Sequence, residues 1–299
     1  MKKILFVIVA VLLVLGIGLL IEALVYTPAW DTRLAERIHP DESNLTYLKR
    51  GLDTRNVDAQ YGDFSMHIGQ TFGDGYTLYI PLDIQFSEDT WQAWKPDDAS
   101  DDVSLIPAGV LLVDRAVSQQ EIDGQSFDAL SALFRGEKYS ARVDMEPWAT
   151  DAEQRQLSYL ISFSTHNRPY NKEDVSLIVD KLMYTDAQGE QVFSPGPFVL
   201  SWTPKNKLPT FEHTFSDEHG NAAGALWLTP LQLRSNFYSS KGVFDTIDIV
   251  MKDGSCRSYP RKYSTNKTTI PFFPPLNPDE VASIRISCEG KVLYDIALS

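Results

Sequence analysis

The sequence predicts a mainly β protein in which an N-terminal transmembrane helix is followed by two β-sandwich domains. Three observations lead to this fold class. The chain opens with a long apolar run, ILFVIVAVLLVLGIGLLI, just after its first three residues. From about residue 60 onward, apolar residues recur at every second position in many short segments, as in half-buried strands. Turn residues separate these segments at short intervals, which is typical of β-sandwiches rather than of βαβ units.

The composition is that of a globular protein. The chain has 299 residues, enough for one large or two ordinary domains, and 43% of them are hydrophobic. With 27 basic and 40 acidic residues the net charge is −13. Such a charge opposes nonspecific binding to nucleic acid, so no nucleic-acid partner is expected.

Residues 4–21 carry neither a charge nor a polar side chain. At about 1.5 Å per residue, a helix over this run spans roughly 27 Å, close to the hydrocarbon thickness of a bilayer. We therefore expect a retained transmembrane helix over residues 4–26. A cleaved signal peptide is the alternative, but its apolar core is usually shorter, at roughly 7–15 residues, and Ile21-Glu22-Ala23 is a poor cleavage site.

The charges beside this run predict the topology. Lys2 and Lys3 favour a cytoplasmic N-terminus, because basic residues flank the cytoplasmic end of a membrane span. Residues 1–3 are then a cytoplasmic stub, and everything beyond residue 26 is extracytoplasmic. The expected location is the cell membrane, with a single pass and the membrane itself as a partner.

Residues 27–54 predict a juxtamembrane stalk of two short helices. Trp30, Leu34 and Ile38 recur every four residues along one face, and Pro40 ends this pattern. A second short helix ends at Gly51, a residue type suited to the position after a helix. The alternative is that the apolar face docks on the ectodomain.

Residues 55–150 predict the first β-sandwich domain. In its clearest strand the apolar residues fall on one face, namely Tyr76, Leu78, Ile80, Leu82, Ile84 and Phe86. Pro81 within this strand indicates an edge position or a bulge. Gly73-Asp74-Gly75 predicts a hairpin turn before it, and residues 126–135 predict a short helix. Residues 146–155 indicate a connection, at which we place the domain boundary.

Residues 151–299 predict the second β-sandwich domain. Apolar residues alternate over Leu157–Phe163, Ile247–Met251, Ile284–Cys288 and Val292–Leu298. Turns such as Asp253-Gly254-Ser255 separate these strands.

The order of segments resembles a known group of proteins. The stretches that carry the resemblance are GDGYTLYIPLDIQF, RQLSYLISFST, KEDVSLIVDKLMYTD, GALWLTPLQLRSNF and NPDEVASIRISCEGKVLYDI. They resemble the ectodomains of Gram-positive, especially clostridial, single-pass membrane proteins of unknown function, which are related to the extracellular domains of anti-sigma-factor-like proteins. The resemblance implies immunoglobulin-like sandwiches. Only three residues precede the span here, so sigma-factor binding is not carried over.

The two cysteines predict a disulfide. Cys256 follows one turn and Cys288 precedes another, so each is expected near a strand end. An oxidising compartment permits a bridge, which would stabilise the fold by roughly 3–4 kcal/mol in the chain-entropy model. Two buried free thiols are the alternative.

Two groups of residues are candidates for binding. His213, Asp217 and His219 offer metal-ligand chemistry, but their spacing fits neither a helix face nor the HExxH arrangement, so no metal site is predicted. Trp91 and Trp94 could form an exposed platform for a sugar or a protein. Alternatively, these tryptophans fold down over the sheet.

The familiar local motifs of nucleophilic catalysis and phosphate binding do not occur in the sequence, whereas a triad or a carboxylate pair from distant segments would leave no such motif. There is neither a Gly-x-Ser-x-Gly elbow nor a phosphate-binding glycine pattern, and no cofactor is expected. The first hypothesis is therefore a non-catalytic, membrane-anchored extracytoplasmic module that binds or senses an envelope protein or glycan. The second is an envelope hydrolase acting on a glycan or peptide. The third is a structural partner of another membrane protein.

Overall fold

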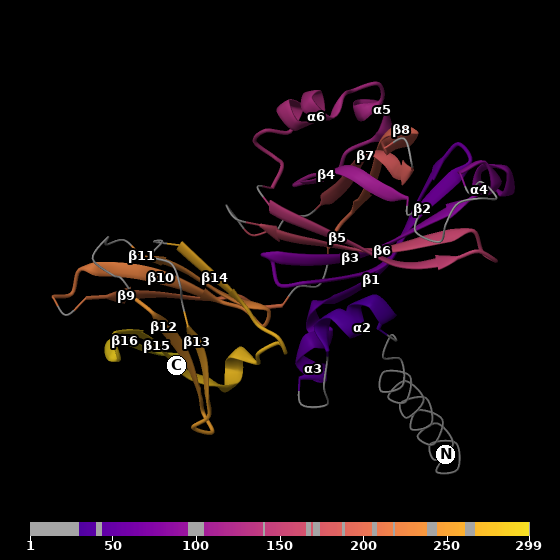
Figure 1. Ribbon diagram of the computed structural model, residues 1–299. Coiled ribbons are helices and arrows are strands. Elements are labelled where there is room, and N and C mark those ends of the chain that lie inside the picture. The colour runs from indigo at the N-terminus through magenta and orange to yellow at the C-terminus, as the bar shows by residue number, and fades with distance from the viewer. Residues whose placement is uncertain are drawn as a thin grey trace, which may run out of the picture. The chain divides into compact units, whose positions relative to one another are not determined.

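The fold of the described part of the chain is mainly β (Figure 1). The computed structural model describes residues 30–39, 44–94, 105–139, 141–165, 169, 174–186, 189–204, 208–217, 219–237, 244–260 and 267–298. The chain divides into two units, Met1–Thr32 and Arg33–Ser299. The expected stub and transmembrane helix, residues 1–26, lie outside the described residues. Within the described residues, no helix combines the length and apolar character that a bilayer crossing requires.

The first eight strands form two antiparallel sheets that pack face to face, and we call them the N-terminal body. The strand orders are β1-β2-β3-β6-β5 in the first sheet and β4-β7-β8 in the second. Their bounds are Leu52–Tyr61 (β1), Phe64–Gly73 (β2), Thr77–Phe86 (β3), Ile106–Val113 (β4), Ala141–Asp151 (β5), Gln156–Thr165 (β6), Val175–Asp186 (β7) and Gly189–Trp202 (β8). Alternate residues such as Leu78, Ile161 and Leu177 meet in one core between the sheets.

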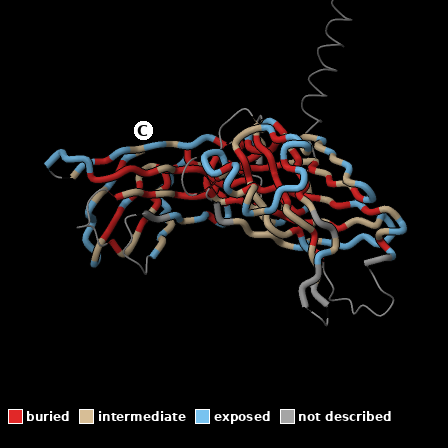
Figure 2. The backbone as a smooth tube through the Cα atoms, turned by 90° about the horizontal axis from the view of Figure 1, so that it is seen from above, coloured by how far each residue is buried: buried red, intermediate tan, exposed pale blue. Residues whose placement is uncertain are grey.

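The last eight strands form the C-terminal body, again two antiparallel sheets around one core. The strand orders are β14-β11-β10-β9 and β13-β12-β15-β16. Their bounds are Phe211–Ser216 (β9), Ala222–Leu228 (β10), Gln232–Phe237 (β11), Thr246–Met251 (β12), Cys256–Pro260 (β13), Lys267–Pro271 (β14), Val281–Cys288 (β15) and Lys291–Ala297 (β16), with a 3-10 turn at Pro278–Glu280 (η2). Figure 2 shows buried positions, in red, along the strands of both bodies.

This grouping corrects the expected domain boundary. A division between residues 150 and 151 separates β5 from β6, which are hydrogen-bonded neighbours in one sheet. The residues around 146–155 are therefore a hairpin within that sheet. The change of body falls later, between Trp202 and Phe211, because the core clusters divide there.

The expectation of a juxtamembrane stalk is also wrong. Residues 33–51 instead dock on the N-terminal body, which was the alternative. Helices α2 (Thr32–Ile38) and α3 (Leu45–Leu48) are followed by the 3-10 turn η1 (Lys49–Gly51). Leu34 and Leu48 are completely buried. Arg33 is 7% exposed, donates to the carbonyls of Leu82 and Tyr159 at 3.2 Å each, and pairs with Asp83. This segment is held against β3 and β6 by burial and charge-assisted hydrogen bonds.

A helical insertion covers the outer face of the second sheet. It contains α5 (Gln119–Ile122) and α6 (Phe127–Leu133), which confirms the short helix expected at 126–135. Ile122, Leu130 and Phe134 pack there with Ile178 and Val199, which point away from the main core. Another short helix, α4 (Glu88–Trp94), follows β3.

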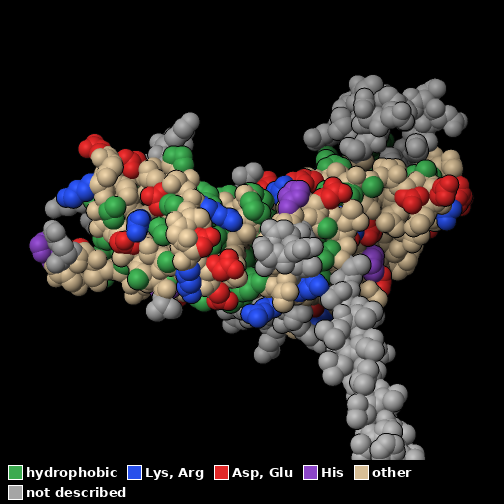
Figure 3. All heavy atoms as spheres, turned by 90° about the horizontal axis from the view of Figure 1, so that it is seen from below, with side chains coloured by type: hydrophobic (Ala, Val, Ile, Leu, Met, Phe, Trp, Pro, Cys, Tyr) green, Lys and Arg blue, Asp and Glu red, His purple; other side chains and the backbone are tan. Residues whose placement is uncertain are grey.

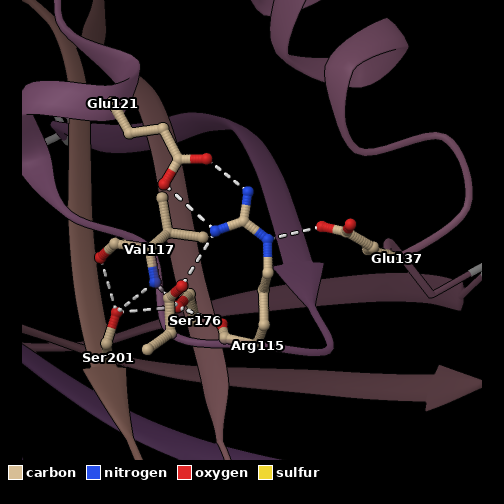
Figure 4. A network of polar contacts seen from close by, with 7 residues as sticks. Arg115, Val117, Glu121, Glu137, Ser176 and Ser201 are labelled. Carbon is tan, nitrogen blue, oxygen red and sulfur yellow. Dashed lines mark hydrogen bonds and ion pairs between the residues drawn. The ribbon is translucent and has the colours of Figure 1, made fainter.

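Polar contacts fix this insertion to the sheet (Figure 4). The Arg115 guanidinium binds Glu121 and Glu137 and lies 5.0 Å from the centre of the Phe134 ring. The Val117 amide donates to Ser176 Oγ at 3.0 Å, and the Ser201 hydroxyl donates to the Val117 carbonyl at 2.9 Å.

Pro81 lies in the middle of its sheet, because β3 has β2 on one side and β6 on the other. The register of β2 and β3 shifts between His67 and Phe72, opposite this proline. Of the two expectations, the edge position is wrong and the bulge is confirmed. Proline has no amide hydrogen to donate, and the bulge accommodates that loss.

The expected disulfide is not formed. Both cysteines are free, Cys256 exposed and Cys288 half-buried. Cys256 lies opposite Val250, which is itself opposite Ser283, five residues before Cys288 on β15. Five residues of strand span roughly 17 Å, whereas a disulfide requires Cα atoms within about 7 Å.

Candidate binding cleft

The N-terminal and C-terminal bodies contact each other through two hairpin turns, one from each body. The β2–β3 turn contributes Asp74, which is fully buried. Its Oδ1 atom accepts from the amides of Tyr76 at 2.9 Å and Thr77 at 2.7 Å. From the β10–β11 turn, the Thr229 hydroxyl donates to Asp74 Oδ2, and Gln232 Nε2 donates to Thr77 Oγ1 at 2.8 Å. Buried polar groups of both turns thus satisfy one another.

Further contacts surround this junction. The Arg234 guanidinium carbon lies 4.2 Å from the centre of the Tyr76 ring, a cation–π contact. The Leu208 amide, in the segment between the bodies, donates to the Gly73 carbonyl at 2.9 Å. Burial raises the pKa of the Asp74 carboxyl above 3.8, and the hydrogen bonds from Thr229 and the two amides oppose that shift.

A cleft of about 340 Å³ lies beside the junction. This volume is in the range of small-molecule sites. Residues from both bodies and from α2 line it: Arg37, Ile38, Thr77, Tyr79, Asp144, Ser162, Ser164, Thr165, Leu231, Gln232, Thr269, Pro271, Phe272, Phe273 and Pro275.

The floor of the cleft is the outer face of the first sheet. Because side chains alternate along β6, Ile161 and Phe163 enter the core while Ser162 and Ser164 face the cleft. Asp144 on β5 lies opposite Ser162, and Tyr79 on β3 lies opposite Ser162 on its other side. Because serine side chains are short, these positions leave space for the cleft.

Arg37 and Phe273 form part of the wall. Arg37 Nη1 lies 3.2 Å from Glu146 Oε1, and its guanidinium carbon lies 5.6 Å from the centre of the Phe273 ring. Phe272 is 1% exposed and anchors its segment in the C-terminal core. Its neighbour Phe273 is 58% exposed and presents its ring to the cleft.

The chemistry of the cleft suits binding through hydrogen bonds and an aromatic face. Asp144 offers acceptors, Arg37 offers donors, and the serine hydroxyls offer both. Burial raises the pKa of Tyr79 above its usual value of 10, against the opposing effect of Arg37, so its hydroxyl keeps its proton at neutral pH.

The expected tryptophan platform is wrong for Trp91. This residue is 4% exposed and packs against Phe86, with ring centres 6.0 Å apart. Trp91 lies in α4, directly after β3, and its indole is part of the core between the sheets. The Trp94 side chain lies outside the described ones.

The histidine candidates do not assemble into a site. Asp217 Oδ1 accepts from the amides of His219 at 2.9 Å and Asn221 at 2.8 Å, so this carboxylate closes the β9–β10 turn. These hydrogen bonds, chiefly from Asn221, lower the pKa of Asp217. Among the described residues, no cluster of three or more potential ligands is placed to hold a metal ion. On the face shown in Figure 3, acidic and basic side chains are interspersed.

Sequence reasoning missed the residues of the cleft. Ser162 and Ser164 occupy the polar positions of a strand that alternates, so they resemble any solvated strand face. The one available signal was the aromatic pair in Pro271-Phe272-Phe273-Pro274-Pro275, of which only one ring is buried.

Comparisons with known proteins give little for this chain. No family model matches it, and none of the curated proteins matches its sequence. Among solved structures it is similar to one described as "the crystal structure of the conserved domain protein from Bacillus anthracis", with a TM-score of 0.40 and 12% identity over 82% of this chain and 81% of that chain.

Proposed function

We propose that the protein is a membrane-anchored extracytoplasmic binding or sensing module of the cell envelope. In this proposal residues 4–26 are the membrane anchor and the two bodies are immunoglobulin-like β-sandwiches beyond the membrane. The apolar run of the sequence supports the anchor, and the paired sheets of each body support the sandwiches. The ligand binds in the cleft between β6 and Phe273.

The observation that carries the proposal is the lining of the cleft. An exposed aromatic side chain, serine hydroxyl groups, one carboxylate and one guanidinium line the same cleft. A pyranose ring has an apolar C–H face and a rim of hydroxyls that both donate and accept hydrogen bonds. This pattern matches Phe273 on one side and Asp144, Ser162 and Arg37 on the other, so the proposed ligand class is an envelope glycan.

Calorimetric titration of the full chain with a β-linked N-acetylglucosamine tetramer tests the proposal. Phe273→Ala is expected to weaken binding roughly tenfold, the loss of one aromatic contact. Asp144→Asn is expected to weaken it as well, because an amide replaces a carboxylate acceptor. Val292→Ala, which truncates an apolar residue of similar exposure on β16, is the matched control and leaves affinity unchanged.

Two outcomes contradict this assignment. Equal affinity of the wild type and Phe273→Ala would show that the glycan does not bind in this cleft. Cleavage of the tetramer during the titration, detected by mass spectrometry, would show that the protein is an envelope hydrolase rather than a binding module.

The topology has its own test, because Cys256 is exposed and free. A membrane-impermeant maleimide added to intact cells is expected to label the protein, and Cys256→Ser is expected to remove most of the label. Labelling that requires cell lysis would place the two bodies on the cytoplasmic side and end the proposal.

A further inference from the structure

A second cavity, of about 400 Å³, opens at one edge of the N-terminal body. β4 is an edge strand of one sheet and β5 is an edge strand of the other. Lys138 bridges to Val113 of β4, and β5 begins three residues later, at Ala141, so the chain brings the two edges together. The residues that line the cavity are Val110, Leu111, Leu112, Phe127, Ser131, Arg135, Lys138, Tyr139, Val143 and Phe163.

The inner part of this cavity is apolar because it reaches the core between the sheets. Leu112 and Phe163 are core residues, 2% and 1% exposed. Val110 and Val143 are half-buried and pack against that core. Phe127 of α6 supplies another apolar side chain.

The charged side chains among the lining residues are both basic. Arg135 follows α6 and is exposed. Lys138 is half-buried, and its ammonium group donates to Ser131 Oγ. Asp114 accepts the Tyr139 hydroxyl at 2.7 Å but is not itself a lining residue.

We propose that this cavity binds an anionic amphiphile, an alkyl chain that ends in a carboxylate. The chain lies between β4 and β5 against Leu112 and Phe163, where burying it removes apolar surface from water. The carboxylate lies at the rim and accepts charge-assisted hydrogen bonds from Lys138 and Arg135. This site is separate from the glycan cleft, and no residue lines both cavities.

Photolabelling of the full chain in phosphatidylcholine nanodiscs tests the proposal. The probe is decanoate with a diazirine at its methyl end, and labelled peptides are located by tandem mass spectrometry. Saturable label is expected on β4, β5 or Phe163. Unlabelled decanoate displaces it, whereas decyltrimethylammonium, of equal chain length and opposite charge, competes at least about tenfold less well.

Variants separate the head group from the chain. Arg135→Gln combined with Lys138→Gln is expected to raise the decanoate concentration for half-competition roughly tenfold. Arg155→Gln, which removes a half-buried arginine paired with Glu88 elsewhere in the body, leaves it unchanged. Val143→Trp fills the cavity and abolishes saturable label, with an unchanged thermal transition as the check on folding.

Three results overturn the proposal: label that does not saturate, label confined to residues 1–29, or equal competition by the two detergents of opposite charge. Each is independent of glycan binding, so the two sites are tested separately.

Discussion

Strands β3 and β7 of the N-terminal body differ from β12 of the C-terminal body in how they are buried. In the N-terminal body, the first six residues of β3 are all buried, and so are the first five of β7. In the C-terminal body, β12 alternates strictly between half-buried and buried positions. The difference arises because helices cover the outer faces of the N-terminal sheets near Leu34 and Ile178, whereas β12 turns one face to its core and the other outward.

The number of covered faces of a sheet determines the sequence pattern of its strands. A sheet with one covered face produces an alternating sequence, and a sheet with two covered faces produces a continuous apolar one. Val175-Ser-Leu-Ile-Val179 is such a run, in which Leu177 and Val179 enter the main core while Ile178 meets the helical insertion. Variants in each body and at their junction test whether the two bodies unfold separately.

The largest effect is expected from a truncation in the N-terminal core. Phe163→Ala should lower the free energy of unfolding by about 3–5 kcal/mol, because it leaves a cavity between the sheets. Hydrogen exchange should show faster exchange in β3 and β6, while β12 and β15 keep their protection. Val192→Ala, at a site 52% exposed, is the control and should change stability by less than about 0.5 kcal/mol. Equal loss of protection in both bodies would show that they unfold as one unit.

The next effect concerns the helical insertion that covers the second sheet of the N-terminal body. Phe134→Ala should cost about 3 kcal/mol in urea unfolding, since this fully buried ring holds the insertion on the second sheet. Arg115→Ala should cost only about 1 kcal/mol, because its ion pairs are partly exposed. A larger loss for Arg115→Ala than for Phe134→Ala would mean that the ion pairs, rather than the apolar contacts, hold the layer.

A smaller effect is expected where the bodies meet. Asp74→Ala should cost about 2 kcal/mol, because two buried amides and the Thr229 hydroxyl lose their acceptor. Asp74→Asn retains one acceptor oxygen and should cost less.

The same carboxyl predicts a pH dependence. Its pKa is raised in the folded state, so its contribution to stability is fully present below about pH 3.8 and is lost as the pH rises through the folded-state pKa. Urea unfolding at pH 4 and pH 7 should therefore show the wild type losing stability relative to Asp74→Asn at the higher pH. A stability difference that is the same at both pH values, or that has the opposite sign, contradicts the burial of this group.

The smallest effect is expected in the C-terminal body. Cys256→Ser should change stability by less than about 0.5 kcal/mol, with or without reductant, because no disulfide is broken. Partial burial and the neighbouring Asp245 and Glu289 raise the pKa of the Cys288 thiol, so iodoacetamide should alkylate Cys256 first. A melting temperature that falls when reductant is added would show that the two cysteines form a disulfide.

The sequence predicts local features better than partnerships between distant segments. The Gly73-Asp74-Gly75 turn, the helix near 126–135 and the alternating C-terminal strands depend on neighbouring residues, and the structure contains them. The predicted position of the domain boundary is wrong, because the sequence alone does not reveal that β5 pairs with β6 in one sheet. The sequence did not predict the junction between the two bodies, because Asp74 and Thr229 are 155 residues apart.

The candidate site illustrates the same limit. Trp91 attracted attention by its residue type, yet burial decides its role, and burial depends on where α4 returns to the core. The cleft residues Ser162 and Phe273 come from segments whose meeting depends on the docking of two hairpin turns. Residue type identified neither of them as a binding residue.

Hydrogen exchange of the full chain, with and without a saturating β-linked N-acetylglucosamine tetramer, tests whether the cleft is the binding site. We predict slower exchange confined to segments that line the cleft, namely Arg37–Ile38 of α2, β5 near Asp144, Ser162–Thr165 of β6, and β14 with the Phe272–Pro275 segment after it. Slower exchange elsewhere, with these segments unaffected, would contradict the claim that this cleft is where the protein binds its ligand.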